Sequence, residues 1–363
     1  MPDVPPLSVV LPVYNAARFL MSALDSILSQ DFREFECIAI NDGSTDQSPC
    51  LLEEYQKRDP RVRVVHQRNI GLVETLNRGI SLARAPLIAR MDADDICLPG
   101  RFMTQMQYFK GRNDLGVLGG QIQLIDERGH LLRTVDYPAG GKELELFLYR
   151  GSPVAHPAVM LRKVAVQEAG LYRRAFKHAE DYDLWLRVHE AGYAIENLKV
   201  PLIGYRQHTE NVSVVHRREQ ALATLAAQCA HRSRFAGLGD PTANLEKLDE
   251  RVFDLFPEAL TADLKNELFL VLIGTNSFVT RDELVKALAA FRRMPADLRR
   301  TRRGTAFLIQ VGWGAWKRHL YLLAAVTVFR AFLTAPVDVV SIVGGKLIRL
   351  VRQFLSERIR RAA

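Results

Sequence analysis

Three carboxylates stand close together after a short apolar stretch of the chain. Residues 87–91 are mostly apolar and predict a buried strand, and Asp92, Asp94 and Asp95 follow it. Acidic side chains are poor strand formers and are costly to bury without a partner. Residues two apart on an extended segment point the same way, so Asp92 and Asp94 can grip one cation, Mg²⁺ or Mn²⁺. The alternative is an acidic loop that caps the following helix through Asp94 or Asp95.

A second acidic group precedes an apolar run with helical spacing at residues 184–188. Its members are Glu180, Asp181 and Asp183. The helix dipole stabilises negative charge at this position, so the group can serve as a cap alone. A carboxylate at a helix start that faces a crevice can instead act as a general base.

The elements that would position these groups alternate between strand and helix. Apolar runs at 7–13, 35–40, 62–65 and 87–91 predict strands, and helical patterns separate them. Such alternation predicts an α/β fold whose mostly parallel sheet has helices on both faces. Ligands of such sheets bind beyond the carboxyl ends of the strands. Four polar groups lie at such ends and should converge: Tyr14-Asn15, Asp42, Asn69–Gly71 and Asp92–Asp95.

The later part of the chain is less regular. Residues 117–125 and 131–137 predict two strands around a turn, 143–148 predicts a short helix, and 156–161 is strand-like. A long helix is expected over 216–234, and mainly helical structure follows to residue 300. We therefore expect a sheet domain over 1–215, a helical extension over 216–298 and a basic tail over 299–363.

Composition narrows the class of protein. The chain has 363 residues, of which 48% are hydrophobic and 25% charged, and its four cysteines have no metal-type or redox-pair spacing. The first residues do not have the pattern of a signal peptide, so we expect a cytoplasmic protein with reduced thiols. The glycine-rich dinucleotide fingerprint and the Walker phosphate loop are both absent from the sequence.

The positive charge of the chain is concentrated at its end. Residues 291–363 hold 15 Lys and Arg against 3 Asp and Glu, whereas the whole chain has a net charge of +8. Residues 340–359 have the pattern of a basic amphipathic helix, which predicts contact with an anionic membrane surface. The alternative is a surface helix packed on the body of the protein. No apolar run reaches the roughly 20 residues of a spanning helix, and no aromatic platform suggests nucleic-acid binding.

Taken together, the motifs resemble the family 2 glycosyltransferases, which are inverting enzymes of the GT-A fold. The resemblance covers about residues 7–215. It rests on a set of short motifs in order along the chain: Val10-Leu-Pro-Val-Tyr-Asn15, Asn41-Asp-Gly-Ser-Thr-Asp46, Asn69-Ile-Gly71 to Asn77-Arg-Gly79, Met91-Asp-Ala-Asp-Asp95, His156-Pro157, Glu180-Asp181 and Tyr205-Arg-Gln-His208.

The resemblance implies roles for single residues. Five of them would line the donor pocket, with Tyr14 near the base and Asp42 at the uracil or ribose: Pro12, Tyr14, Asn15, Asp42 and Asn69. Asp92 would lie near both ribose and metal, Asp94 would ligate the metal, and His208 would approach the metal or the diphosphate. Asp181 would be the catalytic base. Asp95, Glu180 and His156 are further candidates at the same site.

These expectations combine into one hypothesis. The chain would be a metal-dependent inverting glycosyltransferase that moves one sugar from a nucleotide-diphosphate sugar, UDP-linked on the family pattern, to a lipid-linked or cell-surface glycan at the inner face of the cell membrane. The glutamine-rich Arg-Trp signature of processive members is absent after Asp181, which favours single-sugar transfer. The alternatives are a sugar-phosphate nucleotidyltransferase and a non-catalytic scaffold of the same fold that binds membrane through its tail.

Overall fold

The computed structural model describes residues 4–208, 216–261 and 308. The chain divides into two compact units, residues 1–256 and 257–363. Of the second unit, the described residues are 257–261 and 308. The basic tail and the amphipathic helix expected over 340–359 lie outside the described residues.

The first half of the sheet is parallel, as the alternation of elements predicts. Its strands lie in the order β3-β2-β1-β4, and each adjacent pair is parallel. Their bounds are β1 Leu7–Val13, β2 Phe35–Asp42, β3 Val62–Gln67 and β4 Leu87–Arg90. The connecting helices are α1 Ala17–Leu28, α2 Ser48–Arg58 and α3 Leu72–Leu82. All four strands therefore end at the same edge of the sheet.

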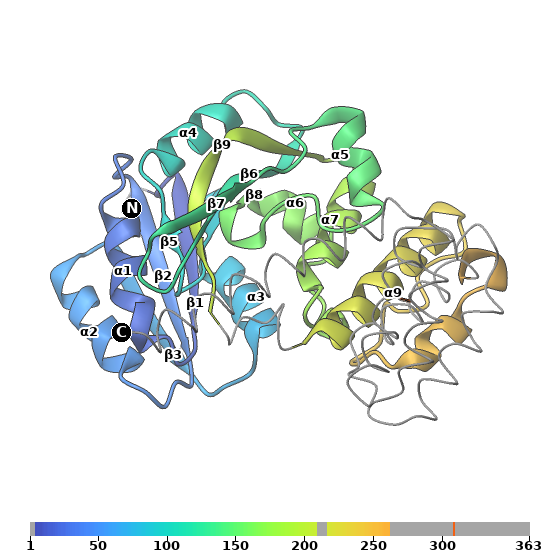
Figure 1. Ribbon diagram of the computed structural model, residues 1–363, viewed down its shortest axis with the longest axis horizontal. Coiled ribbons are helices and arrows are strands. Elements are labelled where there is room, and N and C mark those ends of the chain that lie inside the picture. The colour runs from blue at the N-terminus through green and yellow to red at the C-terminus, as the bar shows by residue number, and fades with distance from the viewer. Residues whose placement is uncertain (1–3, 209–215, 262–307, 309–363) are drawn as a thin grey trace, which may run out of the picture. The chain divides into compact units, whose positions relative to one another are not determined.

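Helices cover both faces of these strands because strand residues alternate in direction. Val9 belongs to a buried cluster with Leu24 of α1 and Leu52 of α2. Val10, its neighbour, faces α3 instead, where a Cβ on Gly79 would lie only 2.4 Å from a Val10 methyl group. A glycine in α3 thus allows the helix to approach the sheet closely. Figure 1 shows α1 and α2 on one side of the blue strands and α3 on the other.

The second half of the sheet is mixed. Its order continues from β4 as β8-β6-β9-β5, with β7 paired to β6. The strands are β5 Ile96–Cys97, β6 Leu115–Ile125, β7 Leu131–Val135, β8 Met160–Arg162 and β9 Ala194–Arg206. Its helices are α4 Arg101–Phe109, α5 Gly141–Leu148, α6 Lys163–Glu168, α7 Glu180–Glu190 and α9 Arg217–Phe235, with the 3₁₀ turns η1 His156–Ala158, η2 Arg174–Phe176 and η3 Glu250–Leu255.

Some elements differ from the sequence-based expectation. The β6–β7 pair confirms the two strands predicted around the turn at 126–130. The strand-like segment 156–161 begins as η1, because Pro157 has no N–H to donate to a neighbouring strand, and only β8 continues it. β9 was not predicted, although it pairs with β6 over most of its length. That pairing joins residues about 80 apart, so no local pattern reveals it.

The C-terminal helix of the first unit packs on the sheet domain. α9 contacts α7, η2 and η3, and the division between the units falls after residue 256. The boundary that the sequence predicts at residue 215, where strands give way to helices, stays a prediction. Within the described ranges, no helix is long and apolar enough to cross a membrane.

Candidate active site

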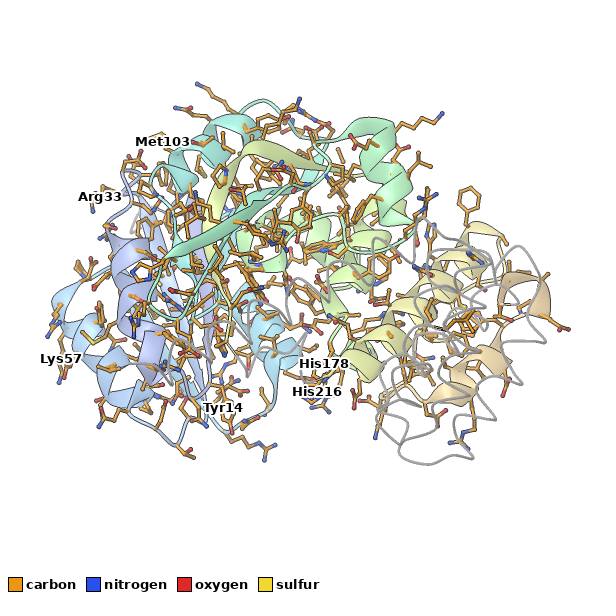
Figure 2. The ribbon with its side chains drawn as sticks, viewed as in Figure 1. Tyr14, Arg33, Lys57, Met103, His178 and His216 are labelled. Carbon is orange, nitrogen blue, oxygen red and sulfur yellow. The ribbon has the colours of Figure 1, made fainter. Side chains whose placement is uncertain are left out.

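The ends of β1 and β2 are tied together by hydrogen bonds between their loops. Asn15 has a positive φ of 48°, a conformation that asparagine tolerates better than most residues. Its side-chain oxygen accepts a hydrogen bond of 2.8 Å from the Thr45 N–H, and its own N–H donates to Ser44. Tyr14 beside it is 53% exposed, whereas Pro12 is buried in β1. Figure 2 labels Tyr14 at the lower edge of the blue part of the molecule, beyond the end of β1.

Asp42 fixes the loop after β3. Its carboxylate is buried and accepts hydrogen bonds from the N–H groups of Ile70 (2.8 Å) and Gly71 (2.9 Å) and from the Gln67 side chain (2.8 Å). Asn69, in the same loop, is exposed. Asp42 therefore shapes the loop that presents Asn69, and a contact of Asp42 with a base or ribose stays a prediction.

The three carboxylates after β4 form one cluster. Single oxygen atoms of Asp92, Asp94 and Asp95 lie within 4.8 Å of one another. The segment is a turn, closed by the Asp95 N–H toward the Asp92 carbonyl at 3.5 Å, and not the extended segment that the sequence predicts. The turn brings Asp95 into the group, which an extended chain would point away. One oxygen of Asp95, Oδ2, is buried without a hydrogen-bond partner in the described part of the chain.

The end of β9 reaches this cluster. His208 Nε2 lies 2.9 Å from Asp94 Oδ2, and the His208 ring packs on Phe19 with centroids 5.7 Å apart. Arg206 donates its backbone N–H to Asp95 Oδ1 (2.8 Å) and its Nε to the Asp94 carbonyl (2.7 Å). The predicted candidates Asp94 and His208, 114 residues apart, are thus neighbours.

The second acidic group begins α7. Asp181 is half-buried, and Ser152 Oγ donates to its Oδ2 at 3.3 Å. Burial raises the pKa of Asp181, although the Tyr182 N–H, Arg90 and Ser152 oppose the rise. A carboxylate with a raised pKa holds a proton more readily, which suits a general base.

Glu180 is more deeply buried than Asp181 and has a different electrostatic state. Its side chain is 6% exposed, and burial, together with the charge of Asp181, raises its pKa to about 7. Burial therefore raises the pKa of both neighbouring carboxyl groups at the start of α7.

His156 contacts two buried aromatic residues, Tyr172 and Trp185. Its Nε2 is 2.8 Å from Tyr172 Oη, and its ring meets Trp185 edge to face at 5.9 Å. Burial, with the charge of Arg90, lowers the pKa of His156 well below its usual value. His156 is therefore neutral and hydrogen-bonded to Tyr172, and its role as a site residue stays a prediction.

The two acidic groups belong to one electrostatic environment. Burial raises the pKa of Asp92, the charge of Arg90 opposes that rise, and the charges of Asp94 and Asp181 add to it. Asp181 therefore lies close enough to Asp92 to affect the ionisation of that carboxyl group. The carboxylates after β4 and the start of α7 therefore influence each other, and the convergence of all four strand-end groups stays a prediction.

Three residues of the site were not predicted from the sequence. They are Arg90, Arg206 and Tyr172. Arg90 had a visible signal, since it is the one charged residue within the apolar stretch 87–91. Tyr172 had none, because its position depends on a reciprocal pair of hydrogen bonds between its backbone and the Asn77 side chain, 95 residues earlier in the chain.

We expect Glu180→Gln to stabilise the metal-free protein at pH 8 and to leave its stability unchanged at pH 4. The folded state holds the Glu180 proton up to about pH 7, whereas the unfolded chain releases it near 4.5. Stability from this group therefore falls as pH rises from 4.5 to 7 and is constant above. The difference at pH 8 should be on the order of 3 kcal/mol. Urea unfolding in EDTA measures it, and an equal difference at both pH values would contradict the assignment.

The family described as "Glycosyl transferase family 2" matches residues 8–170. The O-antigen biosynthesis glycosyltransferase WbnJ of Escherichia coli is 33% identical over 208 residues, covering 56% of this chain and 81% of WbnJ.

Two solved structures are similar in fold. S. aureus TarS 1–349 in complex with UDP-GlcNAc gives a TM-score of 0.54 at 17% identity, covering 89% of this chain and 90% of that one. The mannosyltransferase PcManGT of Pyrobaculum calidifontis, in complex with GDP-Man and Mn²⁺, gives 0.50 at 15% identity, covering 92% and 87%. With a GT-A sheet, an acidic cluster at the strand ends and these relatives, the chain belongs to family 2 of the glycosyltransferases.

Proposed function

We propose that this glycosyltransferase is metal-dependent and inverting, and that it moves a single sugar from a nucleotide-diphosphate sugar to a glycan acceptor. The observation that supports this most directly is the pairing of two acidic groups in one site. The oxygens of Asp92, Asp94 and Asp95 gather within 4.8 Å, and Asp181 at the start of α7 acts on the same group electrostatically. The first group offers oxygen ligands for a cation, and Asp181 can accept a proton.

The residues present fit a divalent cation. All three cluster members offer hard oxygen atoms, and Asp95 Oδ2 is buried without a hydrogen-bond partner in the described residues. Asp92 and Asp94 would hold the ion, with His208 beside Asp94. When bound, Mg²⁺ or Mn²⁺ would neutralise charge on the departing diphosphate. PcManGT, of the same fold, is in complex with Mn²⁺.

Asp181 is the base of the proposed reaction. Its carboxylate takes the proton of the acceptor hydroxyl as the hydroxyl oxygen attacks the anomeric carbon. The C–O bond to the diphosphate breaks on the opposite face of the sugar, so the configuration inverts. Ser152 and the Tyr182 N–H hold Asp181, so that one face of the carboxylate is fixed before the acceptor binds.

The donor pocket is formed by the loops after β1, β2 and β3. Asn15 and Asp42 fix these loops, and the exposed Tyr14 offers an aromatic face for a base. TarS is in complex with UDP-GlcNAc and PcManGT with GDP-Man. We favour a UDP-linked donor because the resemblance assigns Asp42 to uracil.

The acceptor is proposed to be a lipid-linked or cell-surface glycan. WbnJ is an O-antigen biosynthesis enzyme, which supports this class. We place the protein in the cytoplasm at the inner face of the membrane, since its four cysteines, all within the described residues, are free thiols and its tail is basic. The extension 216–298 and tail 299–363 would be distinct functional regions, and neither would bind nucleic acid.

Removing residues 340–363 should weaken binding to anionic vesicles by more than about tenfold, since each basic residue near such a surface contributes about 1 kcal/mol. The segment holds six Lys and Arg against one Glu. Co-sedimentation with phosphatidylglycerol vesicles measures binding, and phosphatidylcholine vesicles are the control. If the full chain and the shortened chain bind the anionic vesicles equally, residues 340–363 have no role in membrane binding.

The proposed function is tested by calorimetric titration with UDP, GDP, CDP and TDP, each with Mn²⁺ and with EDTA. We expect one diphosphate, UDP, to bind with Mn²⁺ and to lose most of its affinity in EDTA. Equal affinity in EDTA would exclude metal-dependent donor binding. If GDP binds more tightly than UDP, the proposed mechanism stands and the proposed donor becomes a GDP-linked sugar.

A further inference from the structure

Arg90 is a buried cation beside the carboxylates that follow β4. It is the last residue of β4 and is 3% exposed, and the other three residues of that strand, Leu87–Ala89, are buried and apolar. A guanidinium in such surroundings is costly unless it is paired and hydrogen-bonded. Its presence therefore needs a physical reason.

The hydrogen bonds of Arg90 are few compared with those of a buried arginine nearby. Arg101 donates to the carbonyls of Arg90 (2.8 Å) and Val159 (3.2 Å) and to the Gln105 side chain (3.1 Å), so it ties backbone segments together. Arg90 Nη1 donates to Asp92 Oδ2 at 2.6 Å, while its Nε is buried without a partner among the described residues. Arg101 stabilises the fold, whereas Arg90 is directed to one carboxylate of the acidic cluster.

The charge of Arg90 is shared by both acidic groups. It is paired with Asp92 of the first group at 2.6 Å. In the second group, burial raises the pKa of Glu180 and of Asp181, and the charge of Arg90 opposes the rise in both. Arg90 is thus the counter-charge that the two groups share.

A divalent cation that approaches Asp92 in the free enzyme meets this guanidinium. The cation would bind Asp92 beside the Arg90 guanidinium, whose Nη1 lies 2.6 Å from Asp92 Oδ2. Two positive charges next to the same carboxylate repel each other. A donor diphosphate brings negative charge that offsets the repulsion.

Resting on the metal dependence proposed above, we propose that Arg90 is a positioning residue that holds Asp92 and weakens cation binding by the free enzyme. The divalent cation then binds tightly only together with the donor diphosphate. Arg90 acts through Asp92 and through charge, and it does not itself contact the transferred sugar.

The test is Mn²⁺ binding, read from the electron paramagnetic resonance of free Mn²⁺, with and without UDP or the diphosphate that binds best in the panel. The parent chain should bind Mn²⁺ at least about tenfold more tightly with the diphosphate. Arg90→Met and Arg90→Gln both remove the charge, and each should bind Mn²⁺ about tenfold more tightly than the parent without nucleotide while kcat falls. Arg90→Lys keeps the positive charge, so without nucleotide this variant should bind Mn²⁺ as weakly as the parent does.

Two controls separate this role from a general loss of structure. Arg84→Met removes the partner of another buried carboxylate, since Arg84 Nε lies 2.9 Å from Glu36, and it should leave Mn²⁺ binding unchanged. In an Asp92→Asn background, Arg90→Met should no longer strengthen Mn²⁺ binding, because the carboxylate it releases is gone. Thermal unfolding in EDTA reports the stability of every variant.

The outcomes are distinct. If the charge-removing variants bind Mn²⁺ no more tightly than the parent, the role of Arg90 is overturned while the proposed function stands. If the parent binds Mn²⁺ equally with and without the diphosphate, the role of Arg90 is overturned without any variant. If the parent binds no Mn²⁺ under either condition, metal dependence fails, and the role of Arg90 fails with it.

Discussion

Asp181→Asn should lower the rate of sugar transfer by about 10³-fold and leave donor binding within about twofold of the parent. The amide has nearly the shape of the carboxylate but cannot accept the proton of the acceptor hydroxyl. Ser152 Oγ can still donate to the amide oxygen that replaces Asp181 Oδ2, so the start of α7 should keep its geometry. Transfer rates at saturating donor and calorimetric binding of UDP with Mn²⁺ measure the two effects separately.

Ser152→Ala is the matched control for this variant. It removes the 3.3 Å hydrogen bond to Asp181 but keeps the carboxylate, so we expect a loss of no more than about tenfold. If Asp181→Asn transfers sugar at the parental rate, the base is another residue. If it also loses donor binding, Asp181 acts on the donor as well.

Asp94→Asn should abolish metal-dependent turnover, with a loss of at least about 100-fold in Mn²⁺ affinity measured with UDP present. An amide oxygen is a weaker ligand than a carboxylate and contributes no charge. Asp94 is 32% exposed and is paired with His208 at 2.9 Å, so its loss should cost little stability. Transfer rates across a Mn²⁺ titration and unfolding in EDTA distinguish the two effects.

Asp114→Asn is the control for charge alone. Asp114 is a surface carboxylate paired with Arg112 at 2.9 Å, and its replacement should leave Mn²⁺ dependence unchanged. Near-normal turnover of Asp94→Asn at parental Mn²⁺ concentrations would exclude Asp94 as a ligand and would point to Asp92 and Asp95.

The first four strands illustrate what local sequence can predict. Their apolar runs and the polar residues that end them repeat the same pattern. The parallel half of the sheet, with Asn15, Asp42 and Asp92 after the ends of its strands, therefore follows from periodicity and the handedness of crossovers. The acidic start of α7 is equally local. The motif set also identified the family correctly.

Other parts of the site depend on contacts that no local pattern encodes. β9 pairs with β6 and brings Arg206 and His208 to Asp94 across more than 110 residues of chain. The turn at 92–95 draws Asp95 into the cluster, where an extended segment would have pointed it away. Long-range pairing and burial decide these positions.

The amino-acid sequence by itself determined the parallel strands, the carboxylates at their ends and the family, because strand and helix periods are properties of neighbouring residues. The tertiary structure alone decided that Arg90 is directed to Asp92 and acts on Asp181 as well. The physical reason is that electrostatic interaction depends on distance and burial, and both arise only when distant segments pack together.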